Sequence, residues 1–474
     1  MKNLNKCLFP FNKSTQENNT VCYPSWSVVV TVKSTPTYIN YFIQHHLALG
    51  AKEIFVFLDS PNDFPLSEIN QDRRVHLIGC DDDFWKNCPH FDCLRYQAGT
   101  RPELVEYRQY HNMLHAQLLT SADWLLMLDI DELLYSRGNV NEILATYPDN
   151  VFSVLARPGE AVYLNEAPQS GLDVYKTPYF KLHKYHSKAY QTIYNRPEMI
   201  NKGGFYGYVS GKSFTCVNKI VMQNSCHLNA SLDRELVEGA VEYNFNVLHF
   251  ESQTPRDFIQ KTINRANKTF NVGLLDKLHV ARTQYLAQIY NEAKANFSEE
   301  KGREVLNEAY HYMHVLSDEK MQLLDDENLI LHIDDKLAQQ PLKYAQIHTH
   351  HNTVLAYNIE QNKVVAVPEE SLHNGSTVPV YLSRSVKRYQ YPKAFFFIRH
   401  QGKVYYLYAN RYGHLVVYDY AKAQLLDVIE KGKIFILALQ DKNLTVKPSG
   451  DVLLNSPNQD KWEFLQENFV HELL

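Results

Sequence analysis

The chain has 474 residues, of which 45% are hydrophobic and 21% are charged, and its net charge at pH 7 is −5. This composition supports more than one buried core and excludes a chain that is disordered by composition. The charge balance excludes a broad basic surface for nucleic acid, and the apolar runs are too short to span a membrane. The N-terminal segment has no apolar stretch of the secretory kind, and the seven cysteines form no paired motif, so we expect a cytoplasmic protein.

Short apolar strands alternate with amphipathic helices from Trp26 to about Phe250. Continuous apolar runs predict buried strands at residues 27–32, 53–58, 75–79, 123–128 and 152–156. Helical periodicity predicts helices at residues 38–49 and 103–119. This order predicts a parallel α/β sheet, in which ligands bind beyond the carboxyl ends of the strands.

The pattern becomes helical after Thr254 and changes to strands from about Asn352. In the last part, apolar strands begin at Val354, Phe395 and Ile434, and each is followed by a polar turn and a second strand. Three units of about 40 residues predict a β-trefoil, with a small irregular barrel as the alternative. We therefore expect four parts: an N-terminal extension (1–25), an α/β domain (26–270), a helical connector (271–345) and a trefoil-like all-β domain (346–474).

Two carboxylates, Asp129 and Asp131, follow the buried strand in the sequence WLLMLDIDE. Residues at i and i+2 of an extended chain point the same way, so both carboxylates can reach one hard cation. Mg²⁺ or Mn²⁺ held there keeps positions open for phosphate oxygens and neutralises a departing diphosphate. The spacing therefore predicts a metal site for group transfer.

An Asp-x-Asp pair after an apolar strand is typical of two enzyme classes. In phosphohydrolases of the haloacid dehalogenase type the first Asp is a nucleophile, but it lies on the first strand and is usually followed by Gly-Thr. Here the pair follows about the fourth strand and precedes Glu-Leu-Leu. The second class is the nucleotide-sugar glycosyltransferases with the GT-A fold, and the strand order favours it.

Further segments, in their order along the chain, resemble a family 2-like glycosyltransferase, in a group related to family 92. These segments are QHHLALGA at 44–51, Arg108-Gln109 leading into DWLLMLDIDELL, Gly211-Lys212-Ser213, and Leu248-His249-Phe250 followed by Ser252 and DFIQK. They cover roughly residues 26–270. The resemblance implies a GT-A domain with a Rossmann-like mixed sheet. It also implies inverting transfer from a nucleotide-diphosphate sugar, with a UDP-sugar favoured.

The resemblance, together with the strand-end positions, also assigns site residues. The expected metal ligands are Asp129, Asp131 and His249. The expected donor contacts are Thr31, Lys33, Asp59, Asp82, Asp129 and Lys212. The candidates for the catalytic base are Glu160, Glu132 and Asp233. One departure concerns the first loop, where the family usually shows Asn-Glu and this chain reads Lys33-Ser34-Thr35-Pro36.

The expected acceptor is a glycan or a lipid-linked saccharide in surface polysaccharide synthesis, reached at the inner face of the membrane. Peripheral membrane contact and a homo-oligomer stay open, and no nucleic-acid partner is expected. The trefoil-like domain would bind acceptor glycan or form a subunit interface. The alternatives are a non-enzymatic glycan-binding protein on a degenerate transferase scaffold, which the 32 tyrosines and the missing Asn-Glu pair favour, and the phosphohydrolase.

Overall fold

The computed structural model of the chain describes most of its 474 residues. The described ranges are 23–91, 94, 96–219, 236–251, 254–266, 277–372, 375–385, 392–418 and 421–472. The predicted base Asp233 and the motif residue Ser252 lie outside these ranges. None of the helices within the ranges is long and apolar enough to cross a bilayer.

Four parallel strands form one end of the first sheet, in the order β3-β2-β1-β4 with β3 at the edge. Their bounds are Trp26–Val32 (β1), Ile54–Leu58 (β2), Val75–Gly79 (β3) and Trp124–Met127 (β4). Every residue of β2 and β4 is buried, as the continuous apolar runs predict. The expectation of parallel α/β architecture is confirmed for this part of the chain.

Antiparallel neighbours extend this sheet past β4, so the sheet is mixed. β8 (Lys212–Cys216) pairs with β4 and with β6 (Ser153–Leu164), and β6 pairs with β7 (Tyr179–Leu182). β9 (Ala240–His249) runs parallel to β6 and antiparallel to β5 (Glu132–Ser136). The sheet therefore changes direction just after β4, where the acidic segment lies.

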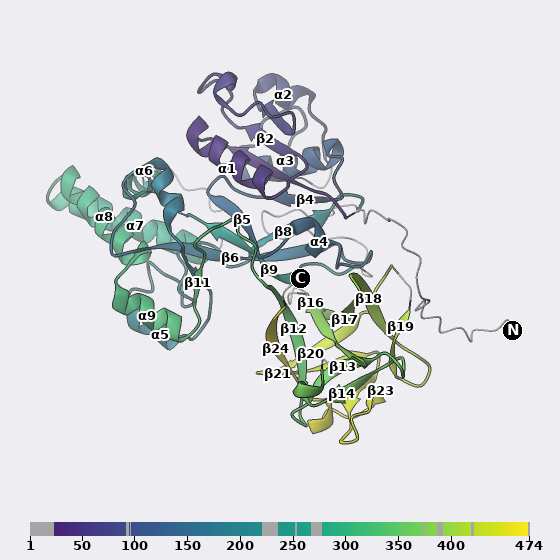
Figure 1. The fold of residues 1–474 in the computed structure, drawn as a ribbon. Helices are drawn as coiled ribbons and strands as arrows, with labels where there is room; N and C mark the ends of the chain where they lie inside the picture. Colours follow the sequence, from purple (N-terminus) through teal and green to yellow (C-terminus); the bar gives the residue numbers. More distant parts are fainter. Residues whose placement is uncertain are drawn as a thin grey trace.

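Helices surround the parallel strands, and Figure 1 shows α1, α2 and α3 around them in the purple and blue part of the ribbon. These helices are α1 (Pro36–Ala48), α2 (Asp82–Asn87) and α3 (Val105–Leu119); two short helices, α4 (Val140–Leu144) and α5 (Lys188–Ile193), follow later in the chain. Asp81 accepts a hydrogen bond from Phe84 N (2.8 Å) and so caps α2. The predicted helices at 38–49 and 103–119 correspond to α1 and α3.

The segment predicted as a helical connector packs against the first sheet. It contains α7 (Lys277–Asn296), α8 (Glu299–His314) and α9 (Asp318–Asp326), and α6 (Pro255–Ala266) precedes it. It also contributes two short strands: β10 (Val315–Leu316) pairs with β6, and β11 (Ile330–His332) pairs with β7. A separate apolar cluster holds these helices, with Leu306 and Tyr310 fully buried.

Six strands of the second sheet pair in a closed ring, β12-β16-β17-β20-β21-β24 and back to β12. They are β12 (Leu342–Thr349), β16 (Tyr381–Arg384), β17 (Lys393–His400), β20 (Leu426–Lys431), β21 (Ile434–Leu439) and β24 (Leu465–Glu472). The predicted boundary between residues 345 and 346 falls inside β12.

Three hairpins extend from the ring: β13–β14, β18–β19 and β22–β23. Their bounds are Val354–Asn358, Lys363–Val367, Lys403–Ala409, Leu415–Tyr418, Lys442–Val446 and Val452–Ser456, and β15 (Thr377–Pro379) pairs with β13. The predicted start at Val354 lies in a hairpin, whereas those at Phe395 and Ile434 lie in ring strands. The first predicted unit therefore starts one strand late, because the ring strand β12, which precedes Val354, was not predicted.

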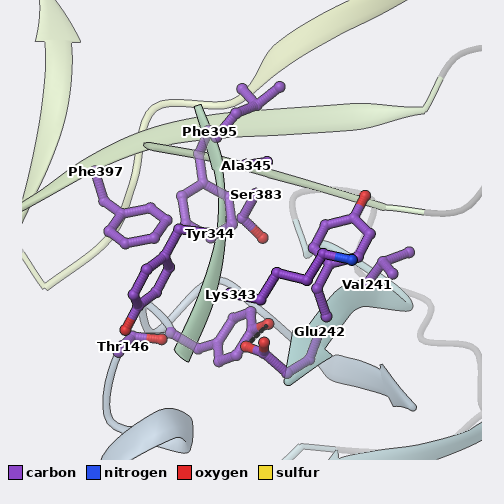
Figure 2. Close-up of a pocket in the computed structure, with 12 residues that line it drawn as sticks. Thr146, Val241, Glu242, Lys343, Tyr344, Ala345, Ser383, Phe395 and Phe397 are labelled. Carbon is purple, nitrogen blue, oxygen red and sulfur yellow. Dashed lines mark hydrogen bonds between the residues drawn. The ribbon is translucent and has the colours of Figure 1, made fainter. Parts of the chain in front are cut away.

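The two sheets share one apolar core, which joins Phe395, Phe397 and Tyr406 of the second part to β9 and α4. Asn150 fixes this contact: its Nδ2 donates to Ala423 O (3.0 Å) and its Oδ1 accepts from Ala423 N (3.0 Å). Figure 2 shows the small cavity at this contact, about 20 Å³, lined by residues of both parts.

Candidate functional site

The acidic segment lies where the sheet order favours a ligand site. β2 and β3 lie on one side of β1 and β4 on the other, so consecutive strands depart in opposite directions and leave a crevice at their carboxyl ends. Asp129 and Asp131 follow β4 directly, and Glu132 begins β5. Thr31 lies near the carboxyl end of β1, at the other side of the crevice.

A row of ionisable side chains crosses four strands next to this segment. Glu132 of β5 lies opposite His249 of β9, His249 opposite Glu160 of β6, and Glu160 opposite Lys181 of β7. Directly opposite residues share a face of the sheet, so the four side chains are neighbours. Their exposed fractions are 0%, 3%, 0% and 0%. Charges buried to this degree are expensive, and they persist where they are paired or bind a metal.

Three of the site's side chains are placed to hold a divalent cation. One ligand atom each from Asp131, His249 and Glu251 lie within 4.8 Å of one another. Nδ1 of His249 is buried without a hydrogen-bond partner, and its Nε2 lies 3.1 Å from Glu251 Oε2. Two carboxylates and an imidazole are a donor set that Mn²⁺ accepts. Within the described ranges, the residues fit the predicted metal.

The electrostatics of this group also favour a cation. Burial alone would lower the pKa of His249, but the carboxylates of Glu251, Asp131 and Glu132 raise it to about 9. Burial raises the pKa of Asp131 above its ordinary value, against the opposing effect of His249. The imidazole thus carries a proton where the surrounding carboxylates attract positive charge. A bound cation would provide that charge instead.

Gly207 leaves the room that this group needs. A Cβ on Gly207 would lie 2.9 Å from His249 Cε1 and 3.1 Å from His249 Nδ1. The same Cβ would lie 3.3 Å from Glu160 Oε2. Any larger residue would therefore displace the imidazole. Gly207 thus serves the site through this close approach.

The first aspartate of the pair lies in a different environment. Asp129 Oδ2 is 2.7 Å from Lys212 Nζ, and Gln109 donates to Asp129 Oδ1. Asp129 does not belong to the three-residue metal group. The chain turns at this point, with Glu132 N donating to Asp129 O (3.1 Å), so the i and i+2 rule for an extended strand does not apply. The metal role predicted for Asp129 stays a prediction that this turn does not favour.

Lys212 links the two acids of the segment. Its side chain is 1% exposed, and its Nζ lies 3.2 Å from Glu132 Oε2 as well as close to Asp129. Glu132 also accepts from Tyr208 OH (2.6 Å) and from Asp129 N (2.8 Å). Burial raises the pKa of Glu132 to about 7, although Lys212 opposes the shift. Lys212, predicted as a donor contact, therefore lies within the acidic cluster.

Glu160 is enclosed by partners. Its Oε1 lies 2.9 Å from Lys181 Nζ, and its Oε2 accepts from Gly207 N (2.7 Å) and Tyr206 N (3.0 Å). Burial alone would raise the pKa of this carboxyl, but Lys181, His314 and the backbone donors outweigh burial and lower it. A catalytic base must reach the acceptor hydroxyl. The base roles predicted for Glu160 and Glu132 stay predictions, and their complete burial argues against both.

The predicted donor contacts lie in or just after strands of the first sheet. Thr31 accepts from Asn112 Nδ2 (2.9 Å), and Asp59 follows β2. Arg108 Nε and Arg101 Nη2 lie 2.8 Å and 2.9 Å from Asp59 Oδ1. Lys33 and Asp82 are exposed. Asp59 therefore positions two guanidinium groups, a feature that strand-end acids alone did not predict.

Two histidines of the QHHLALGA segment are structural, and they hold β5. Nε2 of His45 lies 2.7 Å from Leu134 O, and Leu134 N donates to Nε2 of His46 (3.3 Å). Both rings are buried, and burial lowers the pKa of His45 to about 4. β5 pairs with β9 along its other edge. The two rings thus provide hydrogen-bond partners for backbone groups on the other edge of β5, the strand that begins at Glu132.

Glu251 is the site residue that the sequence interpretation missed. It follows His249 at i+2, the same spacing as Asp129 and Asp131, and this spacing was the available signal. Lys261 Nζ on α6 lies 3.2 Å from Glu251 Oε1. The carboxylate is thereby held beside His249.

Comparison with known proteins adds little to this geometry. No protein-family description matches the chain, and no curated protein matches it. Among solved structures, it is similar to the mannosyltransferase PcManGT from Pyrobaculum calidifontis in complex with GDP-Man and Mn²⁺. That match has 10% identity and covers 65% of this chain and 80% of the other, with a TM-score of 0.23. A likeness this weak supports neither fold nor function.

Proposed function

We propose that the chain is a metal-dependent glycosyltransferase of the GT-A type, which uses a nucleotide-diphosphate sugar. The observation that carries the proposal is the group of Asp131, His249 and Glu251 at the carboxyl end of β4, beside the crevice between β1 and β4. Ligands of open α/β sheets bind in this crevice. A diphosphate lying there would meet the metal group at one side.

Asp131, His249 and Glu251 would hold Mn²⁺ or Mg²⁺. When bound, the cation supplies positive charge to a departing diphosphate. Lys212 keeps Asp129 and Glu132 in place, since its Nζ contacts both carboxylates. Arg101 is 41% exposed in its side chain and is oriented by Asp59, so its guanidinium is available to phosphate oxygens. His45 and His46 position β5 and hence the segment before it.

We keep the finer expectations as part of this proposal: a UDP-sugar donor, inversion, and a glycan or lipid-linked saccharide as acceptor at the inner face of a membrane. We also propose that the second part is a β-trefoil. The closed ring of six strands with three hairpins supports it, since each consecutive group of ring strand, hairpin and ring strand forms one third of the domain.

The test is nucleoside diphosphate release from a panel of UDP- and GDP-sugars, with and without Mn²⁺, together with thermal-shift binding of each donor. We expect one donor to stabilise the chain only when Mn²⁺ is present. Asp131→Asn should remove both the stabilisation and the release, because it deletes an anionic ligand. Asp325→Asn, on the exposed end of α9, is the matched control and should retain both. Donor-independent phosphate release that needs Asp129 would instead support the phosphohydrolase.

A further inference from the structure

An exposed tryptophan lines a hollow on the second domain, far from the metal group in the chain. The hollow has a volume of about 640 Å³, and Trp462 lines it together with Thr445, Lys447, Asn455, Asn458 and Asp460. The chain has four tryptophans, and three of them, Trp26, Trp85 and Trp124, are at most 6% exposed. Trp462 is 45% exposed. An exposed indole offers an apolar face and an N–H group to a ligand, as tryptophans at interfaces do.

The turn that carries Trp462 is built rigidly. It is a short 3-10 helix, η4 (Lys461–Glu463), closed by a reciprocal cap. Asp460 N donates to Glu463 Oε2 (3.1 Å), Trp462 N donates to Asp460 Oδ1 (3.4 Å), and Glu463 is 2% exposed. Trp462 is the middle residue of this turn and is 45% exposed, so the turn presents its ring outward.

Two histidine rings lie near Trp462, each tilted against its neighbour. The His351 ring lies 6.4 Å from the Trp462 ring, and the His350 ring lies 5.6 Å from that of His351. Nε2 of His351 is 3.0 Å from Val446 O of β22, which ties the turn between β12 and β13 to the hollow. The rings thus come from two segments far apart in the chain and are held by main-chain contacts.

We propose that this hollow binds a neutral saccharide. A pyranose has one face of C–H groups, which packs on an indole, and an edge of hydroxyls that both donate and accept hydrogen bonds. Asn455, Asn458 and Thr445 offer both kinds of group. Lys447 and Lys461 line the same hollow as Asp460 and Glu463, so two positive and two negative side chains balance and do not select an anion. The site involves no metal ligand and goes beyond the proposed transfer reaction.

Fluorescence can test the site, because the other three tryptophans are buried and quenching by acrylamide reports mainly on Trp462. The probes are glucose, galactose, mannose and N-acetylglucosamine, and the disaccharides cellobiose, lactose and chitobiose, each added to the full chain. We expect at least one to protect Trp462 from quenching, and inorganic phosphate to give no protection. Protection by none of the sugars, or by phosphate more than by any sugar, would overturn the proposal.

Variants locate the binding. Saturation-transfer NMR on the protecting sugar should show about a tenfold loss of affinity in Trp462→Ala, because it removes the central aromatic anchor. Asn458→Ala keeps the fluorescent reporter and should weaken the protection; the contacts of Asn458 with Ser456 and Asn443 use its main chain, so the turn should persist. Tyr185→Ala removes an exposed ring from the first domain and is the control. Unchanged binding in Trp462→Ala would overturn the assignment.

The result is independent of the proposed transfer reaction. Asp131→Asn, which should abolish donor binding, should leave the sugar protection of Trp462 intact. If protection is found without any donor binding, the saccharide site stands and the transferase proposal fails. If donor binding is found without protection, the reverse holds.

Discussion

The two sheets differ in how many ionisable side chains they bury. In the first, Glu132, Glu160, Lys181, Lys212 and His249 are between 0% and 3% exposed and lie beside one another. From residue 342 onward, Glu463 is the only Lys, Arg, Asp or Glu side chain among the described residues that is buried, and it closes a cap. The second domain has instead a core of aliphatic and aromatic residues, such as Leu355, Leu407 and Leu437.

This difference parallels the two proposals, metal-dependent transfer in the first part and saccharide binding in the second. A buried charge costs stability unless partners compensate it, so a fold gains nothing from a row of them unless they act. The first sheet holds such a row beside the segment that follows β4, where the proposed diphosphate site lies. The second sheet has an apolar core inside its closed ring of strands, and it carries polar groups and Trp462 on its surface. We therefore expect substitutions in the two regions to fail in different ways.

The largest effect is expected from Lys181→Met. It leaves Glu160 fully buried without its cation, which should lower the free energy of unfolding by about 3–5 kcal/mol in urea titrations. Adding Glu160→Gln should recover much of the loss, since the amide oxygen still accepts from Gly207 N. A Lys181→Met variant as stable as the wild type would show that these buried side chains do not form a charged network.

A smaller effect is expected from His46→Leu. The change deprives Leu134 N of its acceptor, and an unpaired buried amide costs about 1–3 kcal/mol. Hydrogen exchange at the Leu134 amide should speed up more than exchange at β12. His332→Leu, at a half-exposed ring, is the control. Uniform acceleration across both sheets would indicate a global loss of stability rather than a loosened β5.

The smallest effect is expected at the contact between the sheets, where Glu242 accepts from Tyr147 OH (2.9 Å) and Asn244 Nδ2 (2.7 Å), beside the cavity in Figure 2. Burial raises the pKa of Glu242 above its ordinary value of 4.5. The folded state then binds more protons than the unfolded state, so this group's contribution to stability is lost as pH rises above 4.5.

Glu242→Gln removes this dependence. The free energy of unfolding of the variant, relative to the wild type, should rise between about pH 5 and pH 8, by on the order of 1 kcal/mol. Thermal unfolding at the two pH values measures the difference. A relative stability that falls with pH would contradict the assigned direction.

Mostly apolar runs made β1 to β4 predictable, and β2 and β4 contain no polar residue because both faces of each strand are buried. The strand β12 mixes Lys343, Gln346 and His348 with apolar residues, and its absence from the prediction put the first repeat out of register. Pairings across strands are invisible to local patterns, so the row from Glu132 to Lys181 could not be predicted.

The position of the candidate site could be predicted from the sequence, but its full set of residues could not. The acids after β4 indicated where a metal site would lie, and Asp131 and His249 are both in the three-residue group. The extended-strand rule placed Asp129 beside Asp131, but the chain turns after Asp129. Glu251 lies next to the segment Leu248-His249-Phe250 but is not one of its motif residues. The pairing of β9 with β5 brings it to Asp131.

The most direct test of the central claim is a crystal structure of the chain soaked with Mn²⁺ and a nucleoside diphosphate, with the anomalous signal of manganese measured. We expect one strong peak between the side chains of Asp131, His249 and Glu251, with the diphosphate extending from it toward Thr31. A peak held by Asp129 without those three residues, or none beyond β4, would contradict the assigned metal group.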